Sequence, residues 1–383
     1  MVKAIGIDSG TKTMDIFGFD DKDGSIIIDV AIPRDQITEG SKGVLEKLRE
    51  AQNRVGKIDA IVGPSGYGMQ LKRAKEATDE EIAEATFVTE ADVKRRLRII
   101  GLRELMIWLR KADDLNTYCT QGVIHLKTVP RYRKVNKIDM GTSDKVLSVV
   151  LAVKDQAERL QIPYDQTSFI LLEVGFGYTS AMAVQNGQIV DAMAGTAGFP
   201  SFLGMGFLDS EVAYAVANVT KDFSKQLLFA GGVASFAEID PSEPLEEFAK
   251  NAKTNSQAKE GYTLMLESIT KDVSSLLPSV KPKEIILSGR FTRIPEFLAA
   301  MKEELSCFFE RTGLKVHISV LEGKAAVTKQ AAEGAAVFAN GLAGGKYKQL
   351  VNAMRLRESE GTVFSNICLG KDIAEGLKVF KKL

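Results

Sequence analysis

The sequence predicts an α/β protein with two domains and mixed sheets. Its 383 residues exceed what one hydrophobic core usually organises, so two domains are expected. Three short strand-like segments joined by tight turns occur at the start of the chain and again from residue 168, and helical and strand-like patterns alternate after each set. We expect domains at 1–162 and 163–383, with the last helix of the second domain packing back on the first. The cleft between them is the natural place for a ligand.

The first repeat opens the chain. Apolar residues cluster or alternate over 2–9, 14–19 and 25–32, with turn residues between them, which predicts three short strands. A helical pattern over 41–55 leads to an apolar run at 58–62 that ends in a glycine-rich turn. The predicted order is strand, strand, strand, helix, strand.

A more polar stretch completes the first domain. Apolar residues recur at helical spacing over 89–111, and a short strand is expected near 123–126 before a basic loop. A long helix is expected at 142–160, with Thr142 or Ser143 as its N-cap.

The second repeat resembles the first in outline. The Asn186-Gly187 pair is a strong signal for a hairpin turn. The three predicted strands of this repeat are 168–174, 179–184 and 188–193. Later elements are a helix at 256–277, strands at 284–287 and 316–321, and an alanine-rich helix at 329–343. The recurrence implies an internal duplication.

Composition and charge narrow the class of partner. Lysine plus arginine equals aspartate plus glutamate at 50 each, so the chain lacks the basic field that drives binding to nucleic acid or anionic membranes. A small-molecule partner is favoured. The three cysteines form no CxxC pair, which argues against a disulfide framework or a zinc site. Because there is no signal-like start and no apolar segment of about 18 residues, we expect a cytoplasmic protein.

A glycine turn rich in hydroxyl groups follows the first strand. The strand delivers Asp8 into the turn, where it would hold magnesium directly or through water. Because glycine has no side chain, backbone N–H groups around it can approach a phosphate closely. The residues expected to bind phosphate are Gly10, Thr11, Lys12 and Thr13. The alternative interpretation is an ordinary hairpin with an aspartate in its turn.

A second turn has the same pattern of strand, acid, glycines and hydroxyl. Here the acid is Glu173, and the following residues expected to bind phosphate are Gly175, Gly177 and Thr179. Two such turns facing each other can hold one polyphosphate from both sides. The recurrence of the pattern about one domain later strengthens the prediction.

A third glycine turn follows the strand at 284–287. It consists of Ser288, Gly289 and Arg290, and a helix with Pro295 in its first turn comes after it. A backbone this compact can lie flat against an adenine ring. The alternative is a common strand-to-helix turn without a ligand.

In this order and spacing the three turns resemble the phosphate-1, phosphate-2 and adenosine motifs of the acetate and sugar kinase, Hsp70 and actin superfamily. The resemblance implies a two-lobed actin-like ATPase fold of the ribonuclease H-like type, with duplicated domains, and it implies ATP and magnesium as ligands. It covers nearly the whole chain with few identities.

A narrower resemblance is to the acetate and butyrate kinases, especially the archaeal group described as predicted butyrate kinases. It rests on 140–145, which is similar to the HGTSHK segment of that family, and on 174–191, which is similar to its second phosphate turn and hairpin. The glycine-rich stretch 195–206 falls where that family has its own glycine-rich loop. The resemblance implies phosphoryl transfer to a short-chain carboxylate such as acetate or butyrate.

Several positions depart from this family. Its histidines correspond to Met140, Asp144 and Glu173 in this sequence, so chemistry by those imidazoles is excluded. The lysine of its first turn falls at Asp15, and Lys12 is the nearest substitute.

The family's arginine likewise has no counterpart in 204–209. Phosphoryl transfer needs mainly positioning and neutralised charge, so other cations can serve. The candidates are Lys12, Arg131, Arg133 and Arg290. The alternative for the pair at 131 and 133 is a solvated basic loop. His125 and His317 lie in apolar runs and are expected to be structural.

The resemblance implies in-line transfer of the γ-phosphoryl group of ATP. Magnesium is expected to be organised by Asp8 and Glu173. The phosphates are expected to be held by Thr11, Lys12 and Thr179. A carboxylate acceptor is ionised near neutral pH and needs no general base, whereas an alcohol acceptor does. Asp139 and Asp144 are the candidates for that base.

Two other functions compete with a kinase. The same fold can use ATP to set a conformation, so a nucleotide-dependent switch or assembly protein is the main alternative. A dinucleotide enzyme is disfavoured, because no GxGxxG opens a helix after the first strand. The apolar second half permits a homodimer.

Overall fold

The computed structural model describes residues 1–34, 42–95, 97–220 and 223–383. The chain divides into two compact units. Unit 1 combines Met1–Thr167 with Gln185–Ile189 and Glu322–Leu383, and unit 2 combines Ser168–Val184 with Val190–Leu321. Each unit contains a hydrophobic core of its own.

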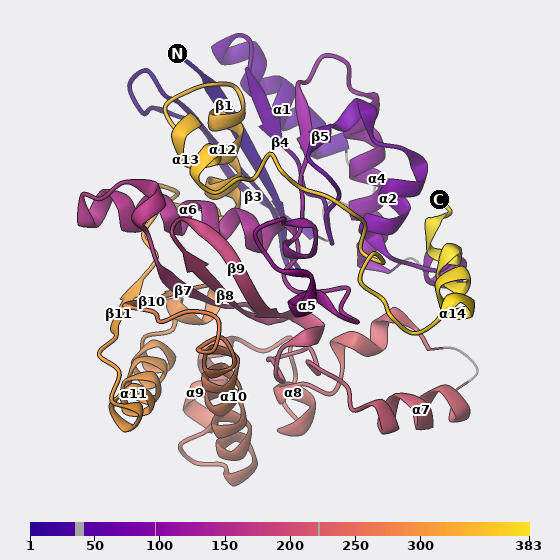
Figure 1. Ribbon diagram of the computed structural model, residues 1–383, viewed down its shortest axis with the longest axis vertical. Coiled ribbons are helices and arrows are strands. Elements are labelled where there is room, and N and C mark those ends of the chain that lie inside the picture. The colour runs from indigo at the N-terminus through magenta and orange to yellow at the C-terminus, as the bar shows by residue number, and fades with distance from the viewer. Residues whose placement is uncertain (35–41, 96, 221–222) are drawn as a thin grey trace. The chain divides into compact units, whose positions relative to one another are not determined.

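Unit 1 is built on a six-stranded mixed sheet (Figure 1). β1 (Lys3–Ser9), β2 (Thr13–Asp20) and β3 (Ile26–Pro33) form an antiparallel meander, which confirms the three predicted strands. β4 (Ala60–Val62) pairs with β1 in parallel, and β6 (Thr117–Cys119) pairs with β4 in parallel. The order across the sheet is β3-β2-β1-β4-β6-β5, so β1 lies in its interior.

The helix α12 (Gln330–Leu342) packs closely on β1 and on a second helix, α6 (Ser143–Leu160). A Cβ added to Gly6 would lie 2.3 Å from the carbonyl oxygen of Ala332, and one added to Gly334 would lie 1.9 Å from that of Leu147. Both distances are well below van der Waals contact. Glycine at these two positions therefore allows α12 to approach β1 and α6 at backbone distance.

The chain returns to unit 1 after residue 321, so the unit boundaries differ from the expected division at residue 162. The physical reason is α12, which buries most of its small side chains against β1 and α6. At the C-terminal end, the Nζ of Lys381 lies 2.6 Å from Glu80 Oε1, and the ring of Phe380 lies 4.2 Å from that of Phe87. These contacts attach the last segment of the chain to unit 1.

Unit 2 repeats the strand order of unit 1. Its sheet runs β11-β10-β7-β8-β9. β7 pairs with β8 in antiparallel and with β10 in parallel, so β7 corresponds to β1 and β10 corresponds to β4. The strands are β7 (Phe169–Val174), β8 (Thr179–Gln185), β9 (Gln188–Ala194), β10 (Glu284–Ser288) and β11 (His317–Val320). Asn186 and Gly187 have φ values of 51° and 73°, as the predicted hairpin turn requires.

One local prediction was wrong, and the predicted N-cap of the long helix was confirmed in position only. The apolar residues near 123–126 form a 3-10 helix, η3 (Val123–His125), and the strand of this region is β6, slightly earlier in the chain. Thr142 stands at the N-cap of α6, but its side chain makes no capping hydrogen bond to the backbone. It donates instead to the carboxylate of Asp144.

The remaining elements complete the two units. In unit 1 they are α1 (Lys42–Val55), β5 (Lys72–Arg73), η2 (Ala74–Glu76), α2 (Asp79–Thr86), α3 (Glu90–Lys94), α4 (Arg98–Lys111), α5 (Arg131–Lys134), η4 (Tyr164–Gln166), α13 (Lys348–Ala353), α14 (Lys371–Gly376) and η8 (Leu377–Lys381). In unit 2 they are η5 (Gly195–Ala197), α7 (Ser210–Val219), η6 (Lys225–Phe229), α8 (Val233–Phe236), α9 (Leu245–Asn251), α10 (Ser256–Ser275), η7 (Arg290–Arg293) and α11 (Pro295–Thr312). None of the helices in the described ranges combines the length and apolarity that a membrane span requires.

Candidate functional site

Two carboxylates face each other at the end of the first hairpin of unit 1. Asp8 in β1 is the direct antiparallel partner of Asp15 in β2. Their exposed fractions are 3% and 1%. Directly opposed residues of an antiparallel pair lie on the same face of a sheet, so two like charges are buried side by side. Such an arrangement requires a compensating cation.

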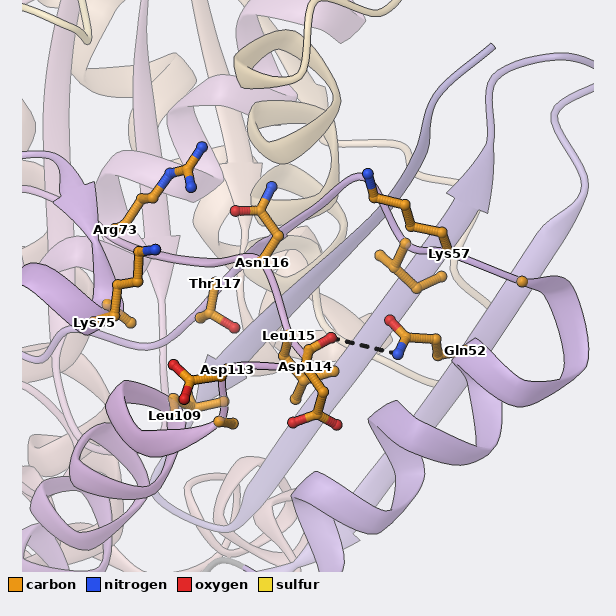
Figure 2. Close-up of a pocket in the computed structure, with 14 residues that line it drawn as sticks. Gln52, Lys57, Arg73, Lys75, Leu109, Asp113, Asp114, Leu115, Asn116 and Thr117 are labelled. Atoms are coloured by element: carbon orange, nitrogen blue, oxygen red, sulfur yellow. Dashed lines mark hydrogen bonds between the residues drawn. The ribbon is translucent and has the colours of Figure 1, made fainter.

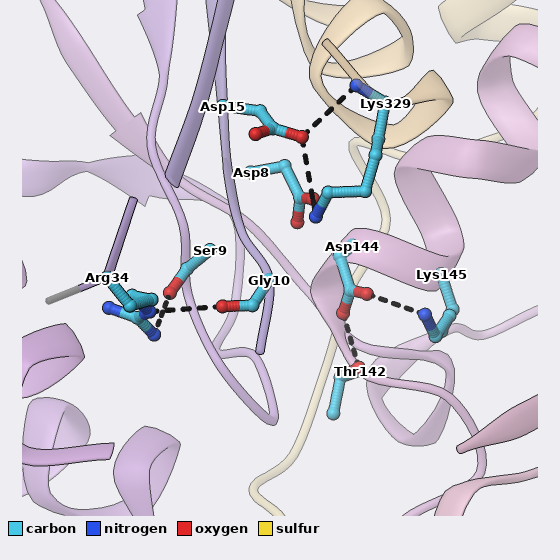
Figure 3. A network of polar contacts seen from close by, with 9 residues as sticks. All are labelled: Asp8, Ser9, Gly10, Asp15, Arg34, Thr142, Asp144, Lys145 and Lys329. Carbon is cyan, nitrogen blue, oxygen red and sulfur yellow. Dashed lines mark hydrogen bonds and ion pairs between the residues drawn. The ribbon is translucent and has the colours of Figure 1, made fainter. Parts of the chain in front are cut away.

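Lys329 supplies that cation from the N-cap of α12 (Figure 3). Its Nζ lies 2.7 Å from Asp8 Oδ2 and 3.4 Å from Asp15 Oδ2, and its backbone N–H donates to Asp15 Oδ2 at 3.1 Å. Burial alone would lower the pKa of Lys329, but the charges of the two aspartates outweigh burial and raise it. The ammonium group is therefore charged at neutral pH.

The ammonium of Lys329 also lies against the predicted phosphate turn. A Cβ added to Gly10 would be 2.0 Å from this Nζ. Thr11 and Lys12 form the tip of the turn, Thr13 begins β2, and all three are half-buried. The predicted phosphate-1 residues are thus brought together with a cation that the sequence did not indicate.

Arg34 fixes the same turn from the end of β3. Its Nε donates to the carbonyl oxygen of Gly10 at 3.0 Å, and its Nη2 donates to Ser9 Oγ at 2.8 Å. Its backbone N–H donates to the carbonyl oxygen of Lys12 at 3.0 Å. These three bonds hold the turn in one conformation, which favours its backbone amides as a ligand-binding surface.

The start of α6 lies near Asp8. Burial alone would raise the pKa of Asp144, but the charge of Lys145 and hydrogen bonds from Lys145 and Thr142 hold this pKa below its ordinary value. Lys145 Nζ lies 2.9 Å from Asp144 Oδ2. Burial raises the pKa of Asp8, the ammonium of Lys329 offsets part of this effect, and the charge of Asp144 adds to it. Asp144 is therefore electrostatically coupled to Asp8.

Asp139 has a different surrounding. It is 7% exposed, and its Oδ1 accepts a hydrogen bond from the N–H of Gly141 at 2.9 Å. Gly141 has a φ of 119°, which favours glycine. Asp139 thus supports the turn that precedes α6, and its role as a general base stays a prediction.

In unit 2, the second and third predicted turns lie at one edge of the sheet. Glu173 near the end of β7 is in register with Ser180 of β8 and with Ser288 of β10. The N–H of Gly175 donates to the carbonyl oxygen of Tyr178 at 3.1 Å, which closes the phosphate-2 turn. Because β7 and β10 are parallel neighbours, the turns that follow them meet at their carboxyl ends.

Close backbone packing joins these two turns. Gly289 has a φ of 93°, and a Cβ there would lie 2.5 Å from the carbonyl oxygen of Val174. Arg290 begins η7 directly after it. On the phosphate-2 side, the carbonyl of Gly177 accepts from the N–H of Gly204 and the N–H of Thr179 donates to Ser201 Oγ. The glycine-rich stretch 195–206 therefore packs against the phosphate-2 turn.

The oxygen atoms at these turns fit a magnesium nucleotide better than a metal held by protein alone. Asp8 Oδ1 is buried and has no hydrogen-bond partner within the described residues. The same part of the chain contains no group of three or more His, Cys, Asp or Glu side chains that could hold a metal. Magnesium in nucleotide sites is commonly bound by one or two carboxylates together with phosphate oxygens and water. Within the described residues Asp15 Oδ1 is buried without a hydrogen-bond partner as well, so the two opposed carboxylates match that mode.

Other candidates lie elsewhere. Arg131 is exposed, Arg133 is half-buried, and the guanidinium of Arg133 lies 5.5 Å from the ring centre of the exposed Tyr132. The segment expected as a basic loop forms the short helix α5. Burial lowers the pKa of His125 to about 4, so the imidazole is neutral at pH 7. A hollow of about 600 Å³ near α1 and α4 contains none of the motif residues (Figure 2).

Lys329 and Arg34 are the residues of this site that sequence reasoning missed. Lys329 is 321 positions from Asp8 along the chain, and it precedes an alanine-rich helix whose packing partner is not visible in the sequence. Arg34 follows β3 directly, and its position opposite the first turn could have been inferred from the antiparallel pairing of β2 with β3.

Comparisons with known proteins agree with this architecture. The sequence model of the family described as "Protein of unknown function (DUF1464)" matches residues 6–369. A search of curated proteins found no match.

Solved structures of acyl kinases are similar in fold. Acetate kinase from Porphyromonas gingivalis is 15% identical, with 88% of this chain and 98% of that chain covered at a TM-score of 0.63. A propionate kinase from Francisella tularensis subsp. tularensis is 13% identical, with 87% and 99% covered at 0.62. Acetate kinase from Entamoeba histolytica is 12% identical, with 84% and 96% covered at 0.60. Together with the repeated strand order, these matches confirm the two-sheet actin-like ATPase fold.

Proposed function

We propose that this chain, which belongs to the DUF1464 family, is an ATP-dependent small-molecule kinase. One observation carries the proposal. In each unit the strand that holds the equivalent interior place, β1 or β7, brings an acid to a glycine turn, and these acids are Asp8 and Glu173. The arrangement of strand, acid and glycine turn therefore occurs twice, which suits a polyphosphate that is bound by two loops.

The chain's own residues would bind and neutralise the nucleotide. The phosphates would lie on the backbone amides of the two turns, and the group at 288–290 would face the adenine. Lys329 would place its ammonium near the phosphates beside Gly10. Asp8 and Glu173 are our candidates for contact with magnesium, which when bound would neutralise charge on the phosphates.

The reaction would transfer the γ-phosphoryl group in line. A bond forms between an acceptor oxygen and the γ-phosphorus while the bond to the β,γ-bridging oxygen breaks, and ADP leaves. Lysine side chains such as Lys329 would stabilise the charge that develops on the phosphoryl oxygens. Positioning and charge neutralisation are the main requirements of this chemistry, so histidine is not needed at Met140 or Glu173.

A short-chain carboxylate is our proposed acceptor. Three observations support it: the GTS segment at the start of α6, its coupling to Asp8 through Asp144, and a fold similar to that of acetate and propionate kinases. A carboxylate is ionised at neutral pH and attacks without a general base. For an alcohol acceptor, Asp139 or Asp144 would have to accept the proton. A butyrate kinase-like preference, a homodimer and a cytoplasmic location are further proposals.

A coupled ADP-release screen tests this function. Purified protein with MgATP is offered acetate, propionate, butyrate and simple alcohols, and Asp8→Asn serves as the inactive variant, with Asp23→Asn in an exposed turn as its matched control. The proposal is supported if a carboxylate stimulates ADP release by wild type and Asp23→Asn but not by Asp8→Asn. MgATP binding without stimulation by any acceptor contradicts it.

A nucleotide-dependent switch is the second candidate. The departures at Met140 and Glu173 from the acyl kinase pattern favour it. Slow hydrolysis of ATP that no small acceptor stimulates, but that a partner protein accelerates, would identify such a switch.

A further inference from the structure

Unit 1 contains a buried arginine for which the described residues provide no counter-ion. Arg103 in α4 is 6% exposed. Its one hydrogen bond runs from Nε to Thr86 Oγ1 at 3.0 Å, and its Nη2 is buried with no partner in the described part of the chain. No described acidic side chain forms an ion pair with it, and burial is what shifts its pKa downward. Arginine stays charged in proteins, so a buried and uncompensated guanidinium is costly.

Thr86 cannot supply the missing charge. Its hydroxyl donates to the carbonyl oxygens of Ile82 or Ala83 while it accepts from Arg103. This arrangement fixes one edge of the guanidinium and leaves the Nη groups for another acceptor. A guanidinium binds carboxylate or phosphate through two parallel hydrogen bonds.

Two residues that precede Arg103 in α4 lie close to parts of the candidate site. A Cβ at Gly101 would lie 3.9 Å from Nη1 of Arg34, the arginine that holds the carbonyl of Gly10. On the other side, Leu102 Cδ2 would lie 3.2 Å from a Cβ at Gly66. The carbonyl of Gly66 accepts from the N–H of Ser143, the first residue of α6. These contacts place α4 beside both segments, while the guanidinium of Arg103 itself is directed to Thr86 of α2.

The surroundings of Arg103 also suit a small organic anion. Leu102 and Met106 of the same helix pack with Ile82 and Ala85 of α2 in one apolar cluster. Next to Thr86, the ring of Phe87 lies 5.9 Å from that of Tyr67. A charged group held by the guanidinium would have apolar side chains close by, which matches a carboxylate with a short hydrocarbon body.

We propose that Arg103 is the recognition residue for a bound carboxylate, with Thr86 as its positioning residue. That this carboxylate belongs to the phosphoryl acceptor rests on the proposed function. The site itself is independent of ATP, so it can be tested without any phosphoryl transfer.

Thermal unfolding of the full chain without nucleotide is the test. Wild type is heated with sodium acetate, propionate or butyrate, and with inorganic phosphate or chloride at the same ionic strength. We expect the midpoint to rise saturably with the carboxylates and to stay unchanged in chloride, because a ligand that binds only the folded state stabilises it. A rise with phosphate but not with carboxylates would overturn the assignment of the ligand.

Three variants make the test specific. Arg103→Met is expected to abolish the rise, and its midpoint without ligand is expected to equal or exceed that of wild type because a buried unpaired charge is removed. Arg103→Lys keeps the positive charge but cannot donate two parallel hydrogen bonds to one carboxylate, so half-saturation should need at least about tenfold more carboxylate. Arg110→Met, in the same helix as Arg103, removes a guanidinium that is paired with Asp79 of α2 and should keep the full rise.

The outcomes separate the site from the kinase. If Arg103→Met keeps the rise, or if wild type shows none, the carboxylate site is refuted whatever the ADP-release screen finds. If the rise depends on Arg103 but no acceptor is phosphorylated, the site stands and the proposed kinase falls. If the kinase is active, Arg103→Lys should raise KM for the acceptor and leave KM for ATP unchanged, and an equal effect on both would overturn the acceptor role.

Discussion

Replacing Lys329 by methionine should destabilise unit 1 strongly. The ammonium contacts two carboxylates that are 3% and 1% exposed, at 2.7 Å and 3.4 Å. Breaking a buried ion pair by removing one partner costs about 3–5 kcal/mol, since the remaining charge stays buried. The side chain of Lys329 is 28% exposed, so we expect the lower end of that range, about 3 kcal/mol.

Urea unfolding followed by the fluorescence of Trp108 measures this cost. Trp108 is the one tryptophan of the chain and lies in α4 of unit 1, so its signal reports the unit that contains Lys329. Lys348→Met, at an exposed position of α13, is the matched control and should change the unfolding free energy by less than about 0.5 kcal/mol. Asp15→Asn should recover part of the loss in the Lys329→Met background, because it removes one of the repelling charges. A cost for Lys329→Met that is no larger than that of the control, or strict additivity with Asp15→Asn, would refute the ion-pair argument.

Three further predictions concern single residues in both units. Burial raises the pKa of Asp272 from 3.8 to about 8. Between these pH values the folded state holds one proton more than the unfolded state, so stability falls as pH rises, by up to about 1.4 kcal/mol per pH unit. Asp272→Asn should flatten this slope in urea titrations at pH 5 to 9, and an unchanged slope would contradict the assignment. Gly334→Ala should lower stability by more than about 2 kcal/mol because its Cβ would meet the carbonyl oxygen of Leu147 at 1.9 Å. Gly43→Ala in α1, where a Cβ would have no described atom within 4 Å, should raise stability by about 0.5–1 kcal/mol. Equal effects of the two variants in calorimetry would contradict the close packing at Gly334. Gly289→Ala should weaken MgATP binding in a calorimetric titration, since a φ of 93° and the nearby Val174 carbonyl leave no room for a methyl group; unchanged affinity would remove this turn from the nucleotide site.

Local patterns predicted most of the two sheets because strand and hairpin signals depend on neighbouring residues. The three strands of each repeat were recovered within a few residues, and Asn186-Gly187 forms the hairpin turn that its sequence specifies. The run at 123–126 failed because a short apolar segment fits a buried 3-10 turn as well as a strand. Periodicity alone cannot separate these two cases.

The polar site was only partly predictable because its completion depends on tertiary packing. The pattern around Asp8 and Gly10 indicated an acid in a phosphate turn. Nothing near it in the sequence indicated that Lys329 would neutralise Asp8, because that contact depends on how α12 packs on β1. That Arg103 has no acidic partner among the described residues is likewise a property of the fold, since the nearby Asp92 pairs with Arg95 and caps α3 instead.

Isothermal titration with MgATP shows directly whether these turns bind a nucleotide. We expect wild type to bind MgATP, Asp8→Asn to bind it about tenfold or more weakly through loss of a charged contact, and Asp23→Asn to bind like wild type. Asp8→Asn leaves Lys329 paired with Asp15, so it should remain folded, which circular dichroism can verify. Absence of binding by wild type, or full affinity in a folded Asp8→Asn variant, would contradict the assignment of these turns to a nucleotide.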